Sequence, residues 1–511
     1  MLLSGILFLV SYALYLLYLM HMFQLNTYKA NEQRAWMRKN AGRLAGRAVL
    51  PVLAGACSLL PWRFARVLQA VLWALSLLFF VRRTPAKKPL VYTARVIRML
   101  VTHAVLLAAL LLAWHLTGLP AGPGLAVLYL ALPGLILLAN WLNQPIQKGI
   151  NRHYINEARR KIRDMPDLKV IGITGSYGKT SVKFFLTELL SARYNVLCTP
   201  RNYNTELGVT RTIREDLNPT HQVFVCEMGA RYVGDIKAIC DIVHPQYGVI
   251  TAIGPQHLDT FHSVENIVAT KFELADSLPA DGCMFLNEDN DYIRRRPVAC
   301  RRVGFGRGEG AAFRLDSLHT DARGSRFSVT LADGTQAAFE TDLIGEYNIL
   351  DVLAAISVAY SLGVTVPELQ RKVRRLQPVE HRLQLLPKNG RISVIDDAYN
   401  SNINGFNGAL DTLALFAQTK VLVTPGMVEL GDEAYALNFQ AGAHAARVCD
   451  YIILVGKKQT QPLYDAVVQD GNFPAEHLIV VESLQEAWQR IPALCGGDMI
   501  VLLENDLPDN Y

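Results

Sequence analysis

Long apolar runs separated by short basic segments fill the first 143 residues. Leu2–Met20 is uncharged over 19 residues, close to the roughly 20 that a helix needs to span hydrocarbon. Val101–Thr117 and Leu125–Leu142 are two further runs of this kind, and the turn rich in Gly and Pro between them cannot continue a helix. Ala48–Val81 holds a shorter apolar run, a Pro-Trp-Arg interruption and a second apolar run. The pattern predicts a helical transmembrane domain over residues 1–143.

Basic residues indicate how often this domain crosses the membrane. They gather in segments 29–47 and 82–98, and the positive-inside rule places both segments in the cytoplasm. The chain between them must then cross an even number of times, so Ala48–Val81 is expected to form two spans or a re-entrant pair, which gives about five spans. Alternatively, Ala48–Leu60 lies in the membrane interface, because 13 residues are few for a span. No Lys or Arg precedes Leu2, which favours an uncleaved anchor over a signal peptide.

The pattern changes after residue 143. Residues 144–166 are polar and basic, which is typical of a helical stalk near anionic lipid head groups. Over residues 167–379, short apolar strands alternate with amphipathic helices, and a β-richer stretch with a hairpin turn at Ala332–Gly334 follows. A second β/α series is expected in residues 380–511, with strands at 392–395, 421–423, 452–455, 479–481 and 500–503. The predicted fold class is therefore α/β: a helical transmembrane domain, a central domain with a mostly parallel sheet, and a Rossmann-like C-terminal domain.

Composition and charge narrow the classes of function. The chain is 51% apolar and 19% charged, which excludes a disordered protein. Residues 1–150 carry 15 Lys and Arg against one acidic residue, Glu32, whereas the remaining 361 residues have a net charge of −8. Because the positive charge alternates with apolar runs, it indicates membrane lipids as partners and no nucleic acid. The eight cysteines form no CxxC pair, which argues against a zinc ribbon and suits a reducing cytoplasm.

A glycine-rich turn follows the first strand of the central domain. Gly172–Ser181 reads Gly-Ile-Thr-Gly-Ser-Tyr-Gly-Lys-Thr-Ser. A strand, such a turn, Gly-Lys-Thr and a helix together bind nucleotide phosphates: backbone N–H groups face the anion, Lys179 adds a positive charge, and the Thr180 hydroxyl can ligate Mg²⁺. The match to GxxxxGK[ST] is imperfect, because the first Gly falls on Ile173. The alternative interpretation is a purely structural turn.

Nine further short motifs follow the glycine-rich turn along the chain. They are Asn202–Gly208, Cys226–Ala230, Ile253–Asp259, Ala269–Glu273, Leu286–Asp289, Gly345–Asn348, His381–Arg382, Ile395–Asn402 and Gly426–Gly431. Thr174–Ser181 resembles the shortened phosphate loop of the Mur ligases, and the other motifs resemble segments of that family in the same order over residues 165–505. The branch that adds D-alanyl-D-alanine is most similar, through "DDaYNaN" and "GM.ELG".

The resemblance implies an ATP-dependent, ADP-forming acid–amino-acid ligase of cell-wall precursor synthesis. Such an enzyme activates a carboxylate as an acyl phosphate and joins it to an amino acid or D-alanyl-D-alanine. Metal and cationic groups must neutralise the transferred phosphoryl group.

The implied catalytic residues are Lys179, Lys271, His257, Glu227 and Arg382. The implied ATP-binding residues are Thr174, Gly175, Ser176, Tyr177, Gly178, Lys179, Thr180, Ser181, Asn287, Asn348, Arg382 and Asp397. The implied Mg²⁺ ligands are Thr180, Glu227, His257 and Lys271. The resemblance also implies that Lys271 carries CO₂ as a carbamate, which requires a neutral amine.

The sequence also departs from the family. Five predicted spans replace the uridine-nucleotide-binding domain, Tyr347 and Asp351 replace His and Asn of "GxHN..N", and Leu503–Asn510 stands where the family has the basic "KGS". Because these differences fall on substrate-facing parts, we hypothesise that the acceptor is a lipid-linked precursor. The protein would then lie in a bacterial plasma membrane, with the ligase domains in the cytoplasm.

Two alternative functions remain. One is a membrane-tethered ATP-binding subunit or scaffold without its own ligase activity, and the other is a transporter ATPase. The second acidic strand motif and the signature loop of such an ATPase are not found.

Overall fold

The structure, a computed structural model, describes residues 2–60, 63–81, 88–256, 258–321, 323–399, 401–428 and 430–506. These residues form two compact units, one that ends at Arg152 and one that runs from His153 to Asp506. Of the predicted site residues, His257 lies outside the described residues.

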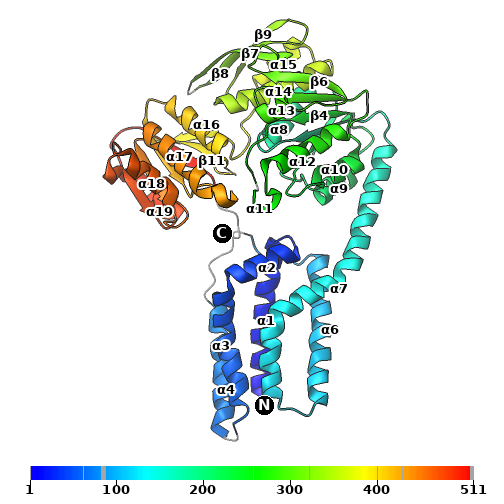
Figure 1. The fold of residues 1–511 in the computed structure, drawn as a ribbon, viewed down its shortest axis with the longest axis vertical. Coiled ribbons are helices and arrows are strands. Elements are labelled where there is room, and N and C mark those ends of the chain that lie inside the picture. The colour runs from blue at the N-terminus through cyan, green and yellow to red at the C-terminus, as the bar shows by residue number, and fades with distance from the viewer. Residues whose placement is uncertain are drawn as a thin grey trace. The chain divides into compact units, whose positions relative to one another are not determined.

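The first unit is helical (Figure 1). Its helices are α1 (Leu2–Leu25), α2 (Ala30–Lys39), α3 (Ala41–Cys57), α4 (Arg63–Ser76), α5 (Leu78–Val81), α6 (Ala94–Leu116) and the first part of α7 (Ala121–Arg163). The three long apolar runs predicted from the sequence lie in α1, α6 and α7, which are long and apolar enough to cross a membrane. Helix α3 packs against α4, and α4 against α1. The five-span count stays a prediction.

Helix α7 continues through the end of the predicted transmembrane domain. Its 43 residues include Pro133 and Pro145, and its last turn carries Arg160, Lys161 and Arg163. Its C-terminal part belongs to the second unit, where Ala158 and Ile162 pack into the apolar core of the central domain. The predicted domain limits at residues 143, 166 and 379 remain predictions.

A nine-stranded sheet forms the central part of the second unit. Its strands lie in the order β2-β3-β1-β4-β5-β6-β7-β8-β9. They are β1 (Lys169–Thr174), β2 (Val196–Cys198), β3 (Val223–Glu227), β4 (Tyr247–Ile250), β5 (Cys283–Asn287), β6 (Arg301–Gly306), β7 (Phe313–Asp321), β8 (Gly324–Thr330) and β9 (Gln336–Thr341). Neighbours from β2 to β7 pair in parallel, whereas β7, β8 and β9 are antiparallel, as the hairpin signal predicted.

Helices cover both faces of this sheet because alternate strand residues point to opposite sides. Ile171 of β1 packs with α8 (Lys179–Leu190), α14 (Glu346–Ser361) and α15 (Val366–Val373). Val170, which precedes Ile171 in β1, points to the other face. There it packs with α9 (Glu206–Glu215), α10 (Asp235–Val243) and α12 (Val264–Asp276). Two short helices, α11 (Leu258–Phe261) and α13 (Asp291–Arg294), complete this part.

A second, six-stranded sheet has the order β10-β11-β15-β12-β13-β14. Its strands are β10 (Gln384–Asn389), β11 (Ile392–Asp397), β12 (Thr419–Thr424), β13 (Tyr451–Val455), β14 (Leu478–Val481) and β15 (Met499–Glu504). All pairs are parallel except β10 with β11. The helices between them are α16 (Ile403–Ala414), α17 (Ala434–Val448), α18 (Gln461–Asp470) and α19 (Leu484–Arg490), with short 3₁₀ turns at Gly431–Glu433, Ala475–His477 and Ile491–Ala493. The predicted α/β fold class is confirmed.

Candidate active site

The glycine-rich turn connects β1 to α8 as predicted. Gly178 has a φ of 82° in the left-handed region that favours glycine, and α8 begins at the next residue, Lys179. The Lys179 ammonium folds back over the turn and donates to the carbonyl oxygens of Gly175 and Ser176, at 2.7 and 2.9 Å. Burial lowers the pKa of Lys179 to about 8. The turn thus holds a cation at the N-terminus of a helix, where phosphate oxygens bind in other proteins.

A buried carboxylate faces this turn from the end of β3. Glu227 Oε1 accepts hydrogen bonds from Thr180 Oγ1 at 3.1 Å and from Asn204 Nδ2 at 2.9 Å. Its Oε2 lies 3.0 Å from the ammonium of Lys183, and both side chains are almost fully buried. Burial alone would raise the pKa of Glu227, but Lys183, Lys179 and the bond from Asn204 outweigh it and hold the pKa below its usual value. Glu227 is therefore an anion next to the turn.

Lys271 of α12 is buried and lies near enough to Lys179 for the two charges to interact. Its side chain is 2% exposed. Burial and the positive charge of Lys179 hold the pKa of Lys271 well below its ordinary value. The lowered pKa favours the neutral amine, which is the form that a carbamate requires.

Arg382 brings the C-terminal part of the unit to the turn. It lies in the segment between the two sheets, where His381 and Leu383 have φ values of 59° and 44°. The Arg382 guanidinium lies 4.3 Å from the ring centre of Tyr399, and its charge reaches Lys179 and Asp351. A second link is the hydrogen bond that Asn404 Nδ2 donates to the Tyr177 hydroxyl of the turn, at 2.7 Å. The structure therefore gathers Lys179, Thr180, Glu227, Lys271 and Arg382 at one place.

Two family descriptions match the second unit. Residues 173–359 match the Mur ligase middle domain, and residues 381–503 match the Mur ligase, glutamate ligase domain. The UDP-N-acetylmuramoyl-tripeptide–D-alanyl-D-alanine ligase of Mycobacterium leprae (strain TN) is 30% identical over 366 residues, which cover 66% of this chain and 70% of that protein. The chain belongs to the Mur ligase family.

Other Mur ligases support this result. The UDP-N-acetylmuramoyl-tripeptide–D-alanyl-D-alanine ligase of Escherichia coli (strain K12) is 30% identical over 302 residues, 58% of this chain and 66% of that protein. The crystal structure of MurF from Acinetobacter baumannii superposes with a TM-score of 0.64 at 25% identity and covers 71% of this chain and 78% of that one. The chain spans less than two thirds of the E. coli relative and 62% of a Mycobacterium tuberculosis relative.

Lys183 is a site residue of this Mur ligase that the sequence analysis did not identify. Its side chain is fully buried, pairs with Glu227 and donates to the backbone carbonyl of Arg201. One signal was present, because Lys183 follows Lys179 by four residues and so lies on the same face of α8. Its burial, however, depends on a carboxylate 44 residues further along the chain.

Asp351 is the second such residue. It was noted only as a departure from the family pattern, yet it lies against the phosphate loop: a Cβ atom added to Gly178 would be 2.5 Å from Asp351 Oδ1. Burial raises the pKa of Asp351 well above its usual value, although Arg382, Ser181 and Lys179 act in the opposite direction. Asp351 therefore faces the cations of the site from α14.

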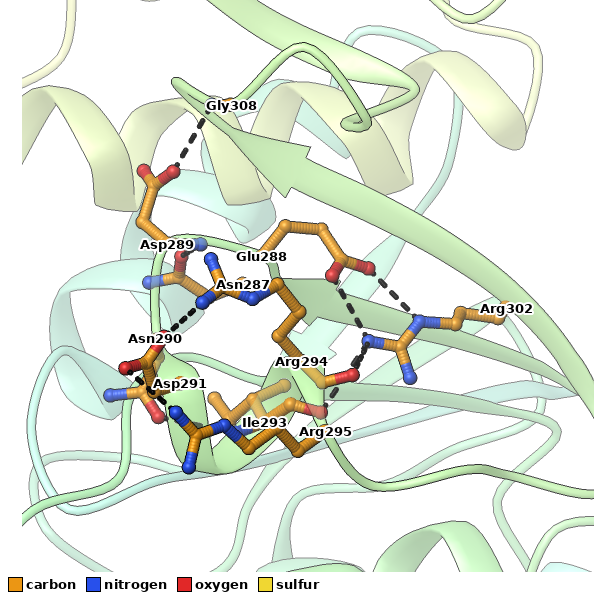
Figure 2. Close-up of polar contacts among 10 residues, drawn as sticks. All are labelled: Asn287, Glu288, Asp289, Asn290, Asp291, Ile293, Arg294, Arg295, Arg302 and Gly308. Carbon is orange, nitrogen blue, oxygen red and sulfur yellow. Dashed lines mark hydrogen bonds and ion pairs between the residues drawn. The ribbon is translucent and has the colours of Figure 1, made fainter.

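The two asparagines predicted to contact adenine make backbone hydrogen bonds. Asn287, at the end of β5, donates to the Thr251 carbonyl at 2.8 Å and accepts from the Asp289 amide at 3.0 Å. Asn348 donates to the Ile344 carbonyl at 3.0 Å. Figure 2 shows the loop that follows Asn287. These bonds shape the loops, and nucleotide contact by the two asparagines stays a prediction.

Ion pairs and backbone bonds brace the loop of Figure 2. Glu288 forms a two-bond pair with Arg302, at 2.9 and 3.1 Å. Asp289 accepts from the amides of Arg307 and Gly308, at 2.8 and 3.2 Å from its Oδ1. The carboxylates of this loop are thus occupied by structural contacts.

The predicted ribose contact, Asp397, ends β11 beside another carboxyl group. Glu504 ends the neighbouring strand β15, is 1% exposed, and accepts from Ser401 Oγ at 2.5 Å. Leu383 donates its amide to Asp397 Oδ1 at 3.1 Å. Burial, and then the mutual repulsion of the two groups, raise the pKa of Glu504, and burial raises the pKa of Asp397. Glu504, in the segment that stands where the family has "KGS", is therefore a buried acid.

The residues that could hold a metal are few in the part of the chain that the structure describes. No three His, Cys, Asp or Glu side chains gather there. Glu227 and the Thr180 hydroxyl offer adjacent oxygen atoms, the donors that Mg²⁺ prefers. Lys271 would add oxygen atoms only as a carbamate.

Proposed function

We propose that this Mur ligase is an ATP-dependent, ADP-forming amide ligase of cell-wall precursor synthesis. The observation that carries the proposal is the convergence of Lys179, Glu227, Lys271 and Arg382 at the phosphate loop. Glu227, Lys271 and Arg382 lie far from the loop in the sequence, so a purely structural turn would give no reason for them to meet. The arrangement suits phosphoryl transfer, in which positioning and charge neutralisation supply most of the catalysis.

The proposed reaction has two steps. A carboxylate oxygen of the acceptor attacks the γ-phosphorus of ATP, ADP leaves, and an acyl phosphate forms. The amine then attacks the acyl carbon, inorganic phosphate leaves, and the amine loses a proton to give the amide. Lys179 and Arg382 hold positive charge beside the transferred phosphoryl group, and the backbone of the turn positions the phosphates.

The oxygen donors of the site fit Mg²⁺. Thr180 and Glu227 would hold it directly, together with His257 and a carbamate on Lys271. When bound, the ion would supply positive charge that helps to neutralise the transferred phosphoryl group. The lowered pKa of Lys271 supports the carbamate, because CO₂ reacts with the neutral amine and releases one proton.

The proposal covers both substrates, the amine and the acceptor. The relatives are named for a UDP-linked muramoyl tripeptide and D-alanyl-D-alanine, so we expect the amine to be an amino acid or that dipeptide. Helices α1, α6 and α7 support a location in a bacterial plasma membrane with the ligase unit in the cytoplasm. We therefore expect the acceptor to be a lipid-linked precursor and not a soluble one.

Amine-dependent ADP release tests the proposal. Detergent-solubilised full-length protein is incubated with ATP, Mg²⁺, membrane lipid extract and single amino acids or D-alanyl-D-alanine. We expect ADP release to require one particular amine and to fall by about 100-fold or more in Lys179→Ala and Lys271→Ala. ATP binding with no amine-dependent release would favour the scaffold. Release with a UDP-linked peptide but not with lipid extract would contradict the lipid-linked acceptor.

A further inference from the structure

Two arginines of α6 have no carboxylate partner in the described part of the chain. Arg95 and Arg98 are one helical turn apart in the first turns of that helix. Glu32 is the only acidic residue among the first 156, and no ion pair joins it to either arginine within the described residues of the first unit. Two positive charges thus lie together, and no carboxylate among the described residues pairs with them.

Neutral amide groups of α7 hold both guanidinium groups in place. Arg98 Nη2 donates to Gln147 Oε1 at 2.6 Å, and Arg95 Nη2 donates to Asn140 Oδ1 at 3.4 Å. The Arg95 guanidinium also lies 4.1 Å from the ring centre of Tyr28. The amide contacts fix the orientation of the two groups and add no negative charge, and the Tyr28 ring compensates the charge of Arg95 only in part.

One donor of this pair is buried and unpaired. Arg98 Nε is shielded from solvent and has no acceptor within the described residues. A buried N–H without a partner is costly, and its partner is commonly an ion or ligand that occupies the site. The exposed arginines of α2, Arg34 and Arg38, lack these restraints and behave as ordinary solvated charges.

A third arginine of this unit differs from the pair. The Arg47 guanidinium lies 3.8 Å from the ring centre of Tyr18 and 5.6 Å from that of Phe80. These aromatic faces compensate its charge in part. Arg47 Nη1 is also buried without an acceptor among the residues described, but no second arginine and no amide side chain is recorded beside it, so Arg47 is not included in the proposed site.

The face of α6 that carries Arg98 continues as an exposed apolar stripe. Val101, Val105 and Leu112 follow at helical spacing and are 58%, 64% and 60% exposed. A ligand with an anionic head and a hydrocarbon chain would match this face along its length. The charge of the pair matches a phosphomonoester or diphosphate, which carries about two negative charges near neutral pH, better than a phosphodiester with one.

We propose that Arg95 and Arg98 bind the phosphate end of a membrane lipid that is a phosphomonoester or diphosphate, with its chain along Val101 and Val105. The arginine forks donate paired hydrogen bonds to the phosphate oxygens, and Arg98 Nε gains the acceptor that it lacks. The inference depends on the proposed function only for the diphosphate, which keeps two negative charges while it links the chain to a group that would carry the acceptor carboxylate. The α6/α7 face thereby selects the class of acceptor.

Binding to the full-length protein tests this site without ATP turnover. Detergent-solubilised protein is titrated with a polyprenyl phosphate, and the bound fraction is read by native mass spectrometry. We expect the double variant Arg95→Gln/Arg98→Gln to bind at least about tenfold more weakly, because charge-assisted bonds to phosphate are lost. The matched control, Arg34→Gln/Arg38→Gln, removes the same charge from exposed positions and should change affinity less than about twofold.

Other ligands in the same assay show which kind of phosphate compound binds. The corresponding polyprenol and phosphatidylglycerol should bind more weakly than the polyprenyl phosphate, and inorganic phosphate should not compete at equal concentration. Arg95→Lys/Arg98→Lys should give intermediate affinity. Lysine keeps the positive charge but lacks the planar guanidinium group that donates paired hydrogen bonds. Equal weakening by both Gln pairs, unchanged binding in the α6 variant, or competition by inorganic phosphate would overturn the site. Intact binding without amine-dependent ADP release would instead overturn the proposed ligase.

Discussion

At the scale of single residues, the pair of Lys183 and Glu227 is the most constrained feature of the site. Both side chains are buried at a separation of 3.0 Å, and Glu227 also accepts from Thr180 and Asn204. The pair therefore holds the carboxylate in a fixed orientation toward the phosphate loop. Removing one member of a buried pair leaves the other charge uncompensated.

Lys183→Met is expected to destabilise the ligase unit by about 3 kcal/mol, because the buried Glu227 carboxylate loses its ion-pair partner. The measurement is the unfolding midpoint in urea of the full-length protein. Lys237→Met is the control, since Lys237 pairs with Asp241 at the surface, where ion pairs contribute little. Equal effects of the two substitutions would show that the buried pair adds nothing to stability.

Glu504 predicts a pH dependence. Its pKa is higher in the folded protein than in the unfolded chain, so its contribution to stability is present below the unfolded pKa and is lost as the pH rises through the raised one. The unfolding temperature should therefore fall from about pH 5 upward, and Glu504→Gln, which stays neutral, should flatten that slope. Scanning fluorimetry between about pH 5 and 9 measures it, with the exposed Glu476→Gln as control. Parallel slopes in the wild type and Glu504→Gln would refute this account.

At the scale of elements, the phosphate loop and α8 depend on a glycine with two constraints. Gly178 has a left-handed φ of 82°, and it also lies close to Asp351. Gly234 precedes α10 in the same way, with a φ of 92°, but a Cβ atom there would meet nothing within 4 Å. The two glycines thus share the left-handed backbone conformation, but only Gly178 has a side chain, Asp351, close to its Cα atom.

Gly178→Ala is expected to weaken ATP binding by at least about tenfold, because the loop must move away from Asp351. Gly234→Ala carries a similar backbone strain of about 1 kcal/mol but should leave the affinity for ATP unchanged. Isothermal titration of the two full-length variants with ATP measures the difference. A similar loss of affinity in both would mean that backbone strain alone, and not the approach to Asp351, limits binding.

Much of the second unit could be predicted from the sequence because its strands are short apolar runs between turn signals. β11 to β15 appear where the pattern placed them. β10 was missed, since Gln384–Asn389 includes Pro387, is mostly polar at its end and shows little alternation. Helix α7 continues past Pro145, although a proline usually ends a helix pattern.

The site was predictable only where a motif is local. Lys179 and Thr180 follow from the loop sequence alone. The position of Arg382 beside Lys179, and the burial of Lys183 and Lys271, depend on contacts between elements far apart in the chain. No local pattern encodes such contacts, so only the family resemblance indicated Arg382 and Lys271, and nothing indicated the role of Lys183.

At the scale of the whole molecule, the chain combines a basic helical unit with an acidic ligase unit. Residues 1–150 carry a net charge of +14 and the remainder −8. A soluble ligase has no need of three helices that are long and apolar enough to cross a membrane. This combination is the reason for the proposal that the acceptor stays in the bilayer.

The most direct test is the mass of the product. Full-length protein is incubated with membrane lipid extract, ATP, Mg²⁺ and the amine that stimulates ADP release, and the lipids are then analysed by mass spectrometry. The account predicts a lipid whose mass rises by that of the amine minus one water, one equivalent for each ADP released, and no such product with Lys179→Ala. ADP release without any new lipid-linked amide, or an amide that forms equally with Lys179→Ala, would contradict it.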